Sequence, residues 1–409
     1  MRGREIFPIR AAVGAGSVTA IANLPVYLVG TLATMIRPDL GFSSIGTGGA
    51  VSLFMATSAL SGLVLGRWVQ DWGTSVAVRV GAGVTGLSML GIAVFAHNWV
   101  ILAGLLVVAG GANATAQMAA NMVLAERSSP INDGLAFGTK QAAVPLATML
   151  AGLSVPVVLG AIDWRWVFVF GAGLAGTIAV IIPQFVVGGI STSRTGAGGD
   201  TNSKKPLDRM VIGLVTVGAF FAAGAATSFA IFIVEFAVST GWTPGAAGTL
   251  LAVGSIGVLL SRIAAGWIID LRTSRGGSPV ALKPASIMMA LGSAGMLLVM
   301  IAGRSPTLLV VGAMLSLIMG WGWPGLMHLA VVSMNREVAA RSTGFILVGV
   351  FGGGVVMPVL LGLIAEYFSY QAGWGLNAVF LGVAAGAFYW AHSVYFRRTA
   401  NEAGLLYRT

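Results

Sequence analysis

The chain is 409 residues long, and hydrophobic residues make up 56% of it while charged residues make up only 9%. Soluble domains carry about 25% charged residues, so this composition excludes a protein that faces mainly water and predicts an integral membrane protein in a lipid bilayer. The net charge is +10, and cysteine is absent, which excludes disulfides, thiolate metal sites and cysteine nucleophiles.

Twelve apolar runs long enough to cross a bilayer follow one another along the chain. A spanning helix needs about 20 apolar residues. A polar segment rich in glycine, serine and threonine, 188–209, separates the sixth run from the seventh and is typical of a linker. We therefore predict an all-α integral membrane protein with two pseudo-symmetric six-helix bundles, 1–187 and 210–396, a cytoplasmic linker at 188–209 and a cytoplasmic tail at 397–409. The predicted spans are 11–36, 45–66, 76–97, 99–124, 135–160, 165–187, 210–237, 246–269, 281–302, 306–332, 342–365 and 372–395.

The positions of the basic residues predict the orientation of these spans. With the N-terminus in the cytoplasm, only Arg37, Arg165 and Arg304 lie on the opposite side. Lys140 lies within a span, and every other lysine and arginine, Arg262 included, is assigned to a cytoplasmic segment. Because cytoplasmic loops carry the excess of Lys and Arg, both termini are predicted to be cytoplasmic in a multi-pass inner-membrane protein. The same bias explains the net charge without nucleic acid as a partner.

Two segments recur about half a chain apart. Residues 152–162, which contain Pro156, recur as 354–364, which begin with Gly354 and contain Pro358. Residues 66–73, after the second predicted span, recur as 266–272 after the eighth. A second half that repeats the first indicates two related bundles around a central path. Helix breakers at matching points of both halves predict bending at Pro156, Gly354 and Pro358.

Twelve spans, a central linker, cytoplasmic termini and the duplicated loop together resemble the major facilitator superfamily over almost the whole chain. The resemblance implies a transporter that works by rocker-switch alternating access. It also implies a charged latch in the loops after the second and eighth spans, where the family has G-x-x-x-D-[RK]-x-G-[RK]. In the first copy Gly66 and Gly73 match, while Gln70 stands at the acidic position and Asp71 at the basic one.

The second copy of the loop keeps Gly266 and Asp270, whereas Leu271 replaces the basic residue and Arg272 lies beside it. Charges at a helix end can form ion pairs and contact helix dipoles in one state and lose these contacts in the other. Ordinary cytoplasmic loop charge is the alternative. The predicted cytoplasmic gate comprises Gly66, Asp71, Gly73, Arg79, Gly266, Asp270 and Arg272.

Polar residues at helical spacing predict the substrate path. The fourth span carries Asn113, Gln117 and Asn121 at i, i+4 and i+8, which share one helix face. Because carboxamides facing lipid are costly, this face should meet water or another helix. The resemblance implies that spans one, four, seven and ten line the cavity, and hydrogen bonds between helices without a ligand role are the alternative. The predicted path comprises Asn23, Tyr27, Asn113, Gln117, Asn121, Lys140, Gln141, Trp321 and His328.

Three titratable residues within spans are candidates for substrate binding or proton coupling. The ammonium of Lys140, near the start of the fifth span, either reaches the cytoplasmic interface or faces the cavity and pairs with an anionic substrate group or a carboxylate. Glu235 and His328 are candidate proton carriers. The alternatives are a water-exposed helix end for Glu235 and a packed, hydrogen-bonded imidazole for His328.

The favoured function is secondary transport of a small organic anion or another small polar metabolite; symport with protons is an inference from the family resemblance and from Glu235 or His328. No Walker A string occurs, so a solute or ion gradient would supply the energy. Residues 138–146, with Lys140 and Gln141, lack the G-x-x-x-G-P-x-x-G-G of drug–proton antiporters and are more similar to cyanate-, nitrate- or small-carboxylate-type permeases. Efflux by a drug–proton antiporter is the first alternative.

Two other classes of protein are weighed against a transporter. A polytopic membrane enzyme would need clustered histidines or carboxylates, but the three histidines are dispersed and no H-E-x-x-H occurs. A non-transporting sensor on the same scaffold is the remaining alternative. We therefore expect no enzyme activity, no cofactor and no metal, a small-molecule substrate with protons as the possible second partner, and a monomer that suffices for transport.

Overall fold

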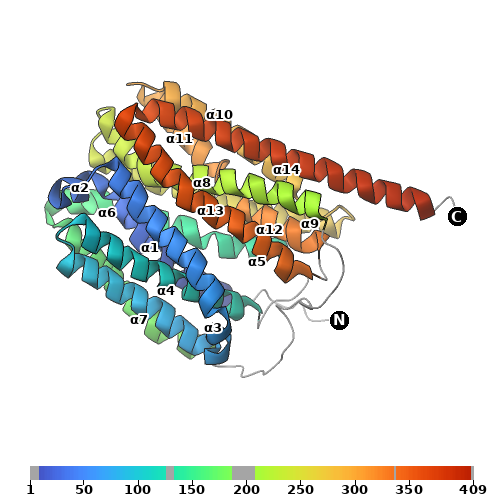
Figure 1. The fold of residues 1–409 in the computed structure, drawn as a ribbon, viewed down its shortest axis with the longest axis horizontal. Helices are drawn as coiled ribbons and strands as arrows, with labels where there is room; N and C mark the ends of the chain where they lie inside the picture. Colours follow the sequence, from blue (N-terminus) through green and yellow to red (C-terminus); the bar gives the residue numbers. More distant parts are fainter. Residues whose placement is uncertain (1–8, 126–132, 187–207, 336–337, 407–409) are drawn as a thin grey trace.

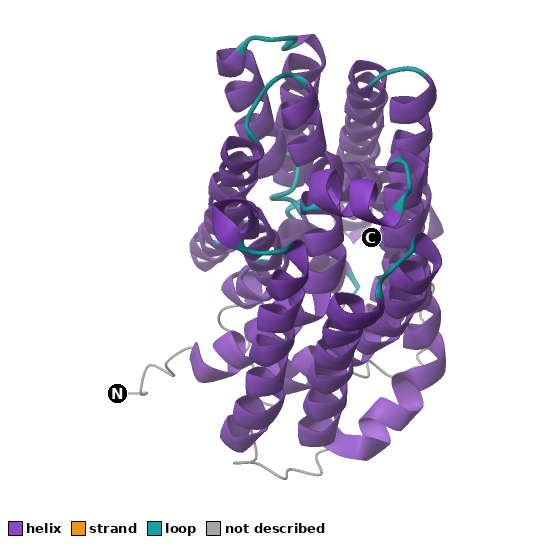
Figure 2. Ribbon diagram, turned by 90° about the vertical axis from the view of Figure 1, so that its left-hand side faces the viewer, coloured by secondary structure: helices purple, strands orange, loops and turns teal. Residues whose placement is uncertain are grey.

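The computed structural model describes residues 9–125, 133–186, 208–335 and 338–406, and the regular elements in them are helices (Figures 1 and 2). The predicted linker lies almost wholly outside the described residues. The described helices are α1 (Ile9–Thr31), α2 (Ala33–Leu40), α3 (Ser44–Phe95), α4 (Trp99–Ala125), α5 (Asp133–Gln141), α6 (Ala143–Ala161), α7 (Trp164–Val186), α8 (Arg209–Ser239), α9 (Pro244–Ser274), α10 (Leu282–Ile301), α11 (Pro306–Ile318), α12 (Pro324–Met334), α13 (Ala339–Tyr367) and α14 (Tyr370–Leu406).

Among the described residues, 11 helical stretches are long and apolar enough to cross a membrane. The shorter apolar helices α11 and α12 occupy the predicted tenth span, which is interrupted between Ile318 and Pro324. The predicted fifth span is also divided, because α5 ends at Gln141 and α6 begins at Ala143. Proline starts a helix well but removes one backbone donor, so Pro324 and Pro145 explain both interruptions.

The predicted second and third spans form one helical element, α3, with a kink at Gly73. Gly73 has φ 76° and ψ 162°. Residues with a side chain rarely adopt this backbone conformation, so glycine is required where the chain turns from one span into the next. The gate glycine that the loop motif predicts therefore has a local structural role as well.

Helices α1–α7 belong to the first predicted half and α8–α14 to the second (Figure 1). Helix α1 begins and α14 ends at the same end of the molecule, which we call the inner end after the predicted topology; the opposite end is the outer end. The halves contact each other through α3 and α13, through α5 and α6 with α9, and through α1 and α8. These contacts surround the middle of the molecule, where the candidate site lies.

Glycines bring the backbones of the two halves together along α6 and α9. A Cβ atom on Gly248 would lie 2.7 Å from the carbonyl oxygen of Gly152, and a Cβ on Gly152 would lie 2.7 Å from that of Gly248. Close to this crossing, the hydroxyls of Thr148 and Ser255 lie 2.8 Å apart. Gly362 of α13 packs on the backbone of α3 in the same way. Both duplicated segments therefore supply small residues to the interface between the halves.

The duplicated segments remain helical at their prolines. Helix α6 continues through Pro156, and α13 continues through Pro358. Gly354 lies against α3, where a Cβ would be 3.4 Å from Met55. The bending of these helices between states stays a prediction.

Candidate functional site

An ion pair joins the two halves at the outer end. Nη1 of Arg37 on α2 contacts Oε1 of Glu235 on α8. Ser44 at the start of α3 accepts a hydrogen bond from Arg37 at 3.0 Å and donates one to Glu235 at 3.2 Å. The amide of Ser44 also donates to Glu366 of α13 at 3.2 Å. Glu235 is only 8% exposed, so the structure contradicts the alternative of a water-exposed carboxylate.

A second ion pair at the outer end lies wholly within the first half. Arg165 of α7 donates to Oδ2 of Asp39 at 2.8 Å, and the indole N–H of Trp164 donates to the same oxygen at 3.1 Å. Burial works against the charged form, but these two hydrogen bonds and the nearby charges of Arg165 and His97 together hold the pKa of Asp39 below its ordinary value. Because Asp39 is largely exposed, this pair adds little stability.

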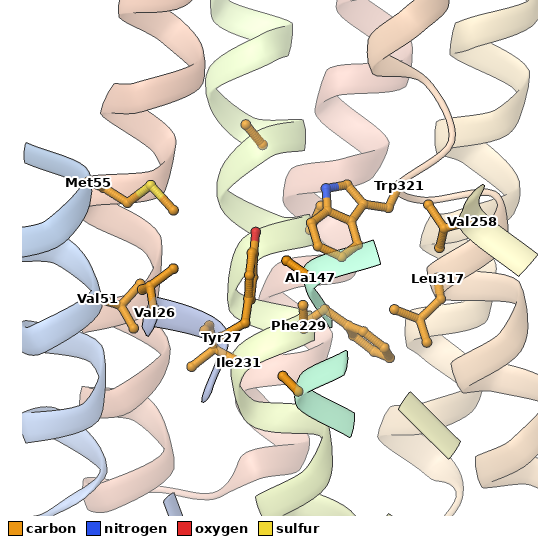
Figure 3. Packing of buried hydrophobic residues seen from close by; sticks show 14 of the residues in the cluster. Val26, Tyr27, Val51, Met55, Ala147, Phe229, Ile231, Val258, Leu317 and Trp321 are labelled. Atoms are coloured by element: carbon orange, nitrogen blue, oxygen red, sulfur yellow. The ribbon is translucent and has the colours of Figure 1, made fainter. Parts of the chain in front are cut away.

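Further contacts between the halves lie between the outer end and the middle of the molecule. Ser52 of α3 donates to the carbonyl of Val355 of α13 at 2.5 Å. Deeper still, Tyr27 of α1 and Trp321 of the second half meet edge to face, with ring centroids 5.9 Å apart (Figure 3). Both rings are buried. These contacts join the two halves from the outer end down to Tyr27 and Trp321, two residues of the predicted path.

Lys140 bonds to a residue of the predicted polar stripe. Its Nζ donates to Oδ1 of Asn121, which links α5 to α4. Asn121 is exposed and Lys140 is half-buried. Two residues that the sequence assigns to the path are thus brought together, and the partner of this ammonium among the described residues is a neutral carboxamide.

The next residue, Gln141, reaches across to the other half. Its Nε2 lies 3.1 Å from Nδ1 of His328 on α12. The same ring nitrogen lies 2.8 Å from the carbonyl of Pro324, one helical turn earlier. His328 is therefore hydrogen-bonded and half-buried beside Lys140 and Gln141, at the contact between the halves.

Arg262 corrects the sequence-based topology. The charge count assigns it to a cytoplasmic segment, but it lies within α9, is 2% exposed and belongs to a membrane-spanning stretch. Its Nε and Nη2 donate to the carbonyl of Trp321 at 2.9 and 2.7 Å, and Nη1 donates to the carbonyl of Gln141. The guanidinium also lies 5.4 Å from the centre of the Trp321 ring. Lys140 is therefore not the single cation within the spanning segments, contrary to the expectation from the charge distribution.

Sequence reasoning missed Arg262 because the positive-inside rule counts charges near span ends. The available signal was its position inside the predicted eighth span, 246–269, since an intramembrane charge marks a functional site by default. Its partners are main-chain carbonyls from two distant parts of the chain, and no side-chain pattern reveals them.

Several predicted path residues use their polar groups within their own half. Nδ2 of Asn23 donates to the carbonyl of Thr19 on the same helix at 2.8 Å. Nδ2 of Asn113 donates to Oγ of Ser58 at 2.9 Å and so joins α4 to α3. These contacts fit the alternative of hydrogen bonding between or along helices. Gln117 lies half-buried on α4 between Asn113 and the exposed Asn121.

At the inner end, Asp270 of the loop motif contacts the other half. Its Oδ2 accepts a hydrogen bond of 2.8 Å from the backbone N–H of Leu135, in the first turn of α5. A carboxylate at a helix N-terminus is stabilised by the unpaired N–H groups and the helix dipole. The other gate residues are arranged differently: Asp71, Arg79 and Arg272 are exposed, Gly66 is half-buried, and Gly266 is buried.

Replacing Asp270 by alanine is expected to loosen the inner end of α5 from α9. The substitution removes the acceptor of the Leu135 N–H, and losing such a cap costs about 0.5–2 kcal/mol. The apparent unfolding temperature of the purified protein should fall. Asp71→Ala, at an exposed position of the other loop copy, is the control. Equal unfolding temperatures for both variants would show that the contact contributes nothing.

Two helix bundles that pack around a polar and cationic middle have the architecture of a membrane transporter. The sequence profile of the Major Facilitator Superfamily matches residues 15–270 and 215–404. The chain belongs to this superfamily. No curated protein matches the sequence.

Two solved structures have a similar fold, both of a bacterial homologue of the human lysosomal transporter Spinster. The inward-facing, occupied form matches with a TM-score of 0.71 at 15% identity, covering 97% of this chain and 99% of that chain. The inward-facing, unoccupied form matches with a TM-score of 0.74 at 14% identity and the same coverage. At these identities the likeness concerns the fold alone.

These findings confirm the predicted fold class and the superfamily. They also indicate a multi-pass membrane transporter of small molecules and not an enzyme. The branch of cyanate-, nitrate- or small-carboxylate-type permeases receives no support from them.

Proposed function

We propose that this protein is a secondary transporter of small organic anions that works by alternating access. The proposal rests on one observation: a lysine within a spanning helix, Lys140, is hydrogen-bonded to the neutral carboxamide of Asn121. Intramembrane cations usually face a cavity and pair with a carboxylate or with a ligand. An anionic substrate group would supply the missing negative charge.

The surroundings of Lys140 strengthen this reading. Arg262, the other intramembrane cation of the region, has main-chain carbonyls as its hydrogen-bond partners. Among the described residues, neither cation forms an ion pair with a carboxylate. One buried and one half-buried positive charge, neither paired with a carboxylate in the part of the chain that the structure describes, favour an anion over a neutral or cationic solute. Gln141 and His328 add hydrogen-bonding groups for the polar atoms of such a substrate.

The outer ion pair suggests how protons would be coupled to transport. Protonation of Glu235 from the outer side would remove its attraction for Arg37 and favour separation of the outer ends. His328 is the second candidate proton carrier, since it lies beside the proposed anion site. Symport with protons, uptake into the cytoplasm and a working monomer with both termini cytoplasmic in the inner membrane are parts of this proposal.

The proposal is tested by binding and counterflow with the purified wild-type protein. Acetate, lactate, succinate and citrate serve as anionic probes, with neutral glycerol and the cationic dye ethidium for comparison. At least one anion should raise the unfolding temperature and exchange in proteoliposomes. If only ethidium raises the unfolding temperature and exchanges, drug efflux replaces the proposal. If only glycerol exchanges, transport of neutral solutes replaces it.

Lys140→Ala is expected to weaken binding of the active anion by about 10- to 100-fold. A hydrogen bond to a charged group contributes about 1.5–3 kcal/mol, and about 1.4 kcal/mol corresponds to a factor of ten. Lys140→Arg keeps the charge and should lose much less. Isothermal titration with the active anion measures both variants. If Lys140→Ala binds the active anion as tightly as the wild type does, the charge-pairing role of Lys140 is ruled out.

A further inference from the structure

The partners of Arg262 lie at the interruptions of two spans. Pro145 has no N–H, so the carbonyl of Gln141, four residues earlier, lacks the donor that a continuous helix would provide. The carbonyl of Trp321 lies in the interruption between α11 and α12. Lipid offers no donor to a free carbonyl, so such groups must be satisfied from within the protein. The guanidinium of Arg262 satisfies both.

These two interruptions belong to different halves. Gln141 ends α5 in the first half, whereas Trp321 precedes α12 in the second half, to which Arg262 itself belongs. The side chain of Arg262 is therefore hydrogen-bonded to one interrupted span in each half. A planar guanidinium offers five donors in a fixed fork, which suits two separate carbonyls, whereas an ammonium is a compact point charge on a flexible stem.

The residues next to these carbonyls form the candidate site. Lys140 directly precedes Gln141, and His328 lies in the first turns of α12, which starts just after Trp321. The Gln141 side chain bonds to His328 across the same contact. The distance between Lys140 and His328 therefore depends on how the two interrupted spans are positioned relative to each other.

We propose that Arg262 is a positioning residue: by binding the carbonyls of Gln141 and Trp321 it keeps the broken fifth and tenth spans in register, and so sets the spacing of Lys140 and His328. The role of that spacing rests on the proposed function, whereas the tie itself does not. Arg262 acts through the backbone carbonyls that it binds, and its own side chain is buried.

Spin-label distances test the tie in the full chain without any substrate. The native sequence has no cysteine, so Thr139→Cys on α5 and Ser333→Cys on α12 give a uniquely labelled parent. We expect one narrow distance distribution in the parent and a broadened or displaced one in both Arg262→Lys and Arg262→Gln. Arg304→Lys, at an exposed position near the outer end, is the matched control and should leave the distribution unchanged.

Pro145→Ala provides a test specific to the Gln141 carbonyl. Alanine at 145 restores the backbone N–H that this carbonyl lacks, so it should partly return the Arg262→Gln distribution to that of the parent. A purely global loss of stability would not be corrected at this one position. If Arg262→Gln fails to fold, the same comparison with Arg262→Lys decides the question.

Three outcomes would overturn the proposal. Distributions unchanged in both Arg262 variants would show that no tie exists. A parent-like distribution in Arg262→Lys together with a changed one in Arg262→Gln would assign the effect to charge and not to the fork. If Pro145→Ala does not return the distance distribution of the Arg262→Gln variant toward that of the parent, the effect of Arg262 cannot be assigned to the Gln141 carbonyl. Because no anion is added, none of these outcomes bears on whether the protein transports anions.

Discussion

Glu235→Arg is expected to separate the outer ends of the two halves. Two guanidinium groups would then face each other where Arg37 and Glu235 now pair across α2 and α8. The position is buried, and Oε2 of Glu235 has no partner among the described residues, so the carboxylate depends on Arg37 and Ser44. Breaking a buried pair costs about 3–5 kcal/mol, which corresponds to more than a hundredfold change in an equilibrium between states.

Spin labels at His97→Cys in the first half and Arg304→Cys in the second measure this separation, since both native residues are exposed. The distance should increase in Glu235→Arg. The charge-exchanged double variant Arg37→Glu with Glu235→Arg should restore most of the parent distribution. A folded Glu235→Arg protein with the distance distribution of the parent would show that the ion pair between Arg37 and Glu235 does not hold the outer ends together.

The outer end also offers a matched control. Asp39→Arg disrupts the ion pair with Arg165, which lies at the same end of the molecule but within the first half and is more exposed. We expect the distance between the halves to stay unchanged in this variant. An equal effect of Asp39→Arg and Glu235→Arg would point to a general response to added positive charge.

Gly248→Leu is expected to force α6 and α9 apart. A Cβ at position 248 would lie 2.6 Å from Cβ of Val155 and 2.7 Å from the carbonyl oxygen of Gly152. The neighbouring atoms are backbone or a branched side chain, so they cannot move aside cheaply. Overpacking costs about 1–3 kcal/mol, and here the strain falls on the contact between the halves. The unfolding temperature should therefore fall.

A disulfide measures the same contact directly. The hydroxyls of Thr148 and Ser255 lie 2.8 Å apart across α6 and α9, so Thr148→Cys with Ser255→Cys should cross-link readily in the otherwise cysteine-free chain. Gly248→Leu should slow this reaction. Gly173→Leu, where a Cβ meets no atom within 4 Å, is the control and should change neither quantity. A cross-linking rate that is the same in all three proteins would show that the glycine contact is dispensable.

The sequence predicted which residues belong to the candidate site, but it did not predict the partners of their side chains. The helical spacing of Asn121 and the position of Lys140 within a span assigned both residues to the predicted path, and the structure joins the two by a hydrogen bond. Asn113 belongs to the same stripe, yet its carboxamide binds Ser58 inside the first half. A stripe on one helix shows which residues share a face, but which neighbour that face meets depends on the packing of other helices.

The sequence by itself determined that the chain is an all-helical membrane protein with the features of its superfamily, and it showed two segments that recur about half a chain apart. These properties are local or periodic: hydropathy over about 20 residues, turn residues, and repeated segments can be read without knowing any contact. The tertiary structure alone decided that Glu235 is paired and buried, and which groups bind the guanidinium of the buried Arg262. Both depend on groups far away in the chain, Arg37 for one and the carbonyls of Gln141 and Trp321 for the other. A buried charge is stable only where such partners converge, and that convergence arises when the two halves pack together.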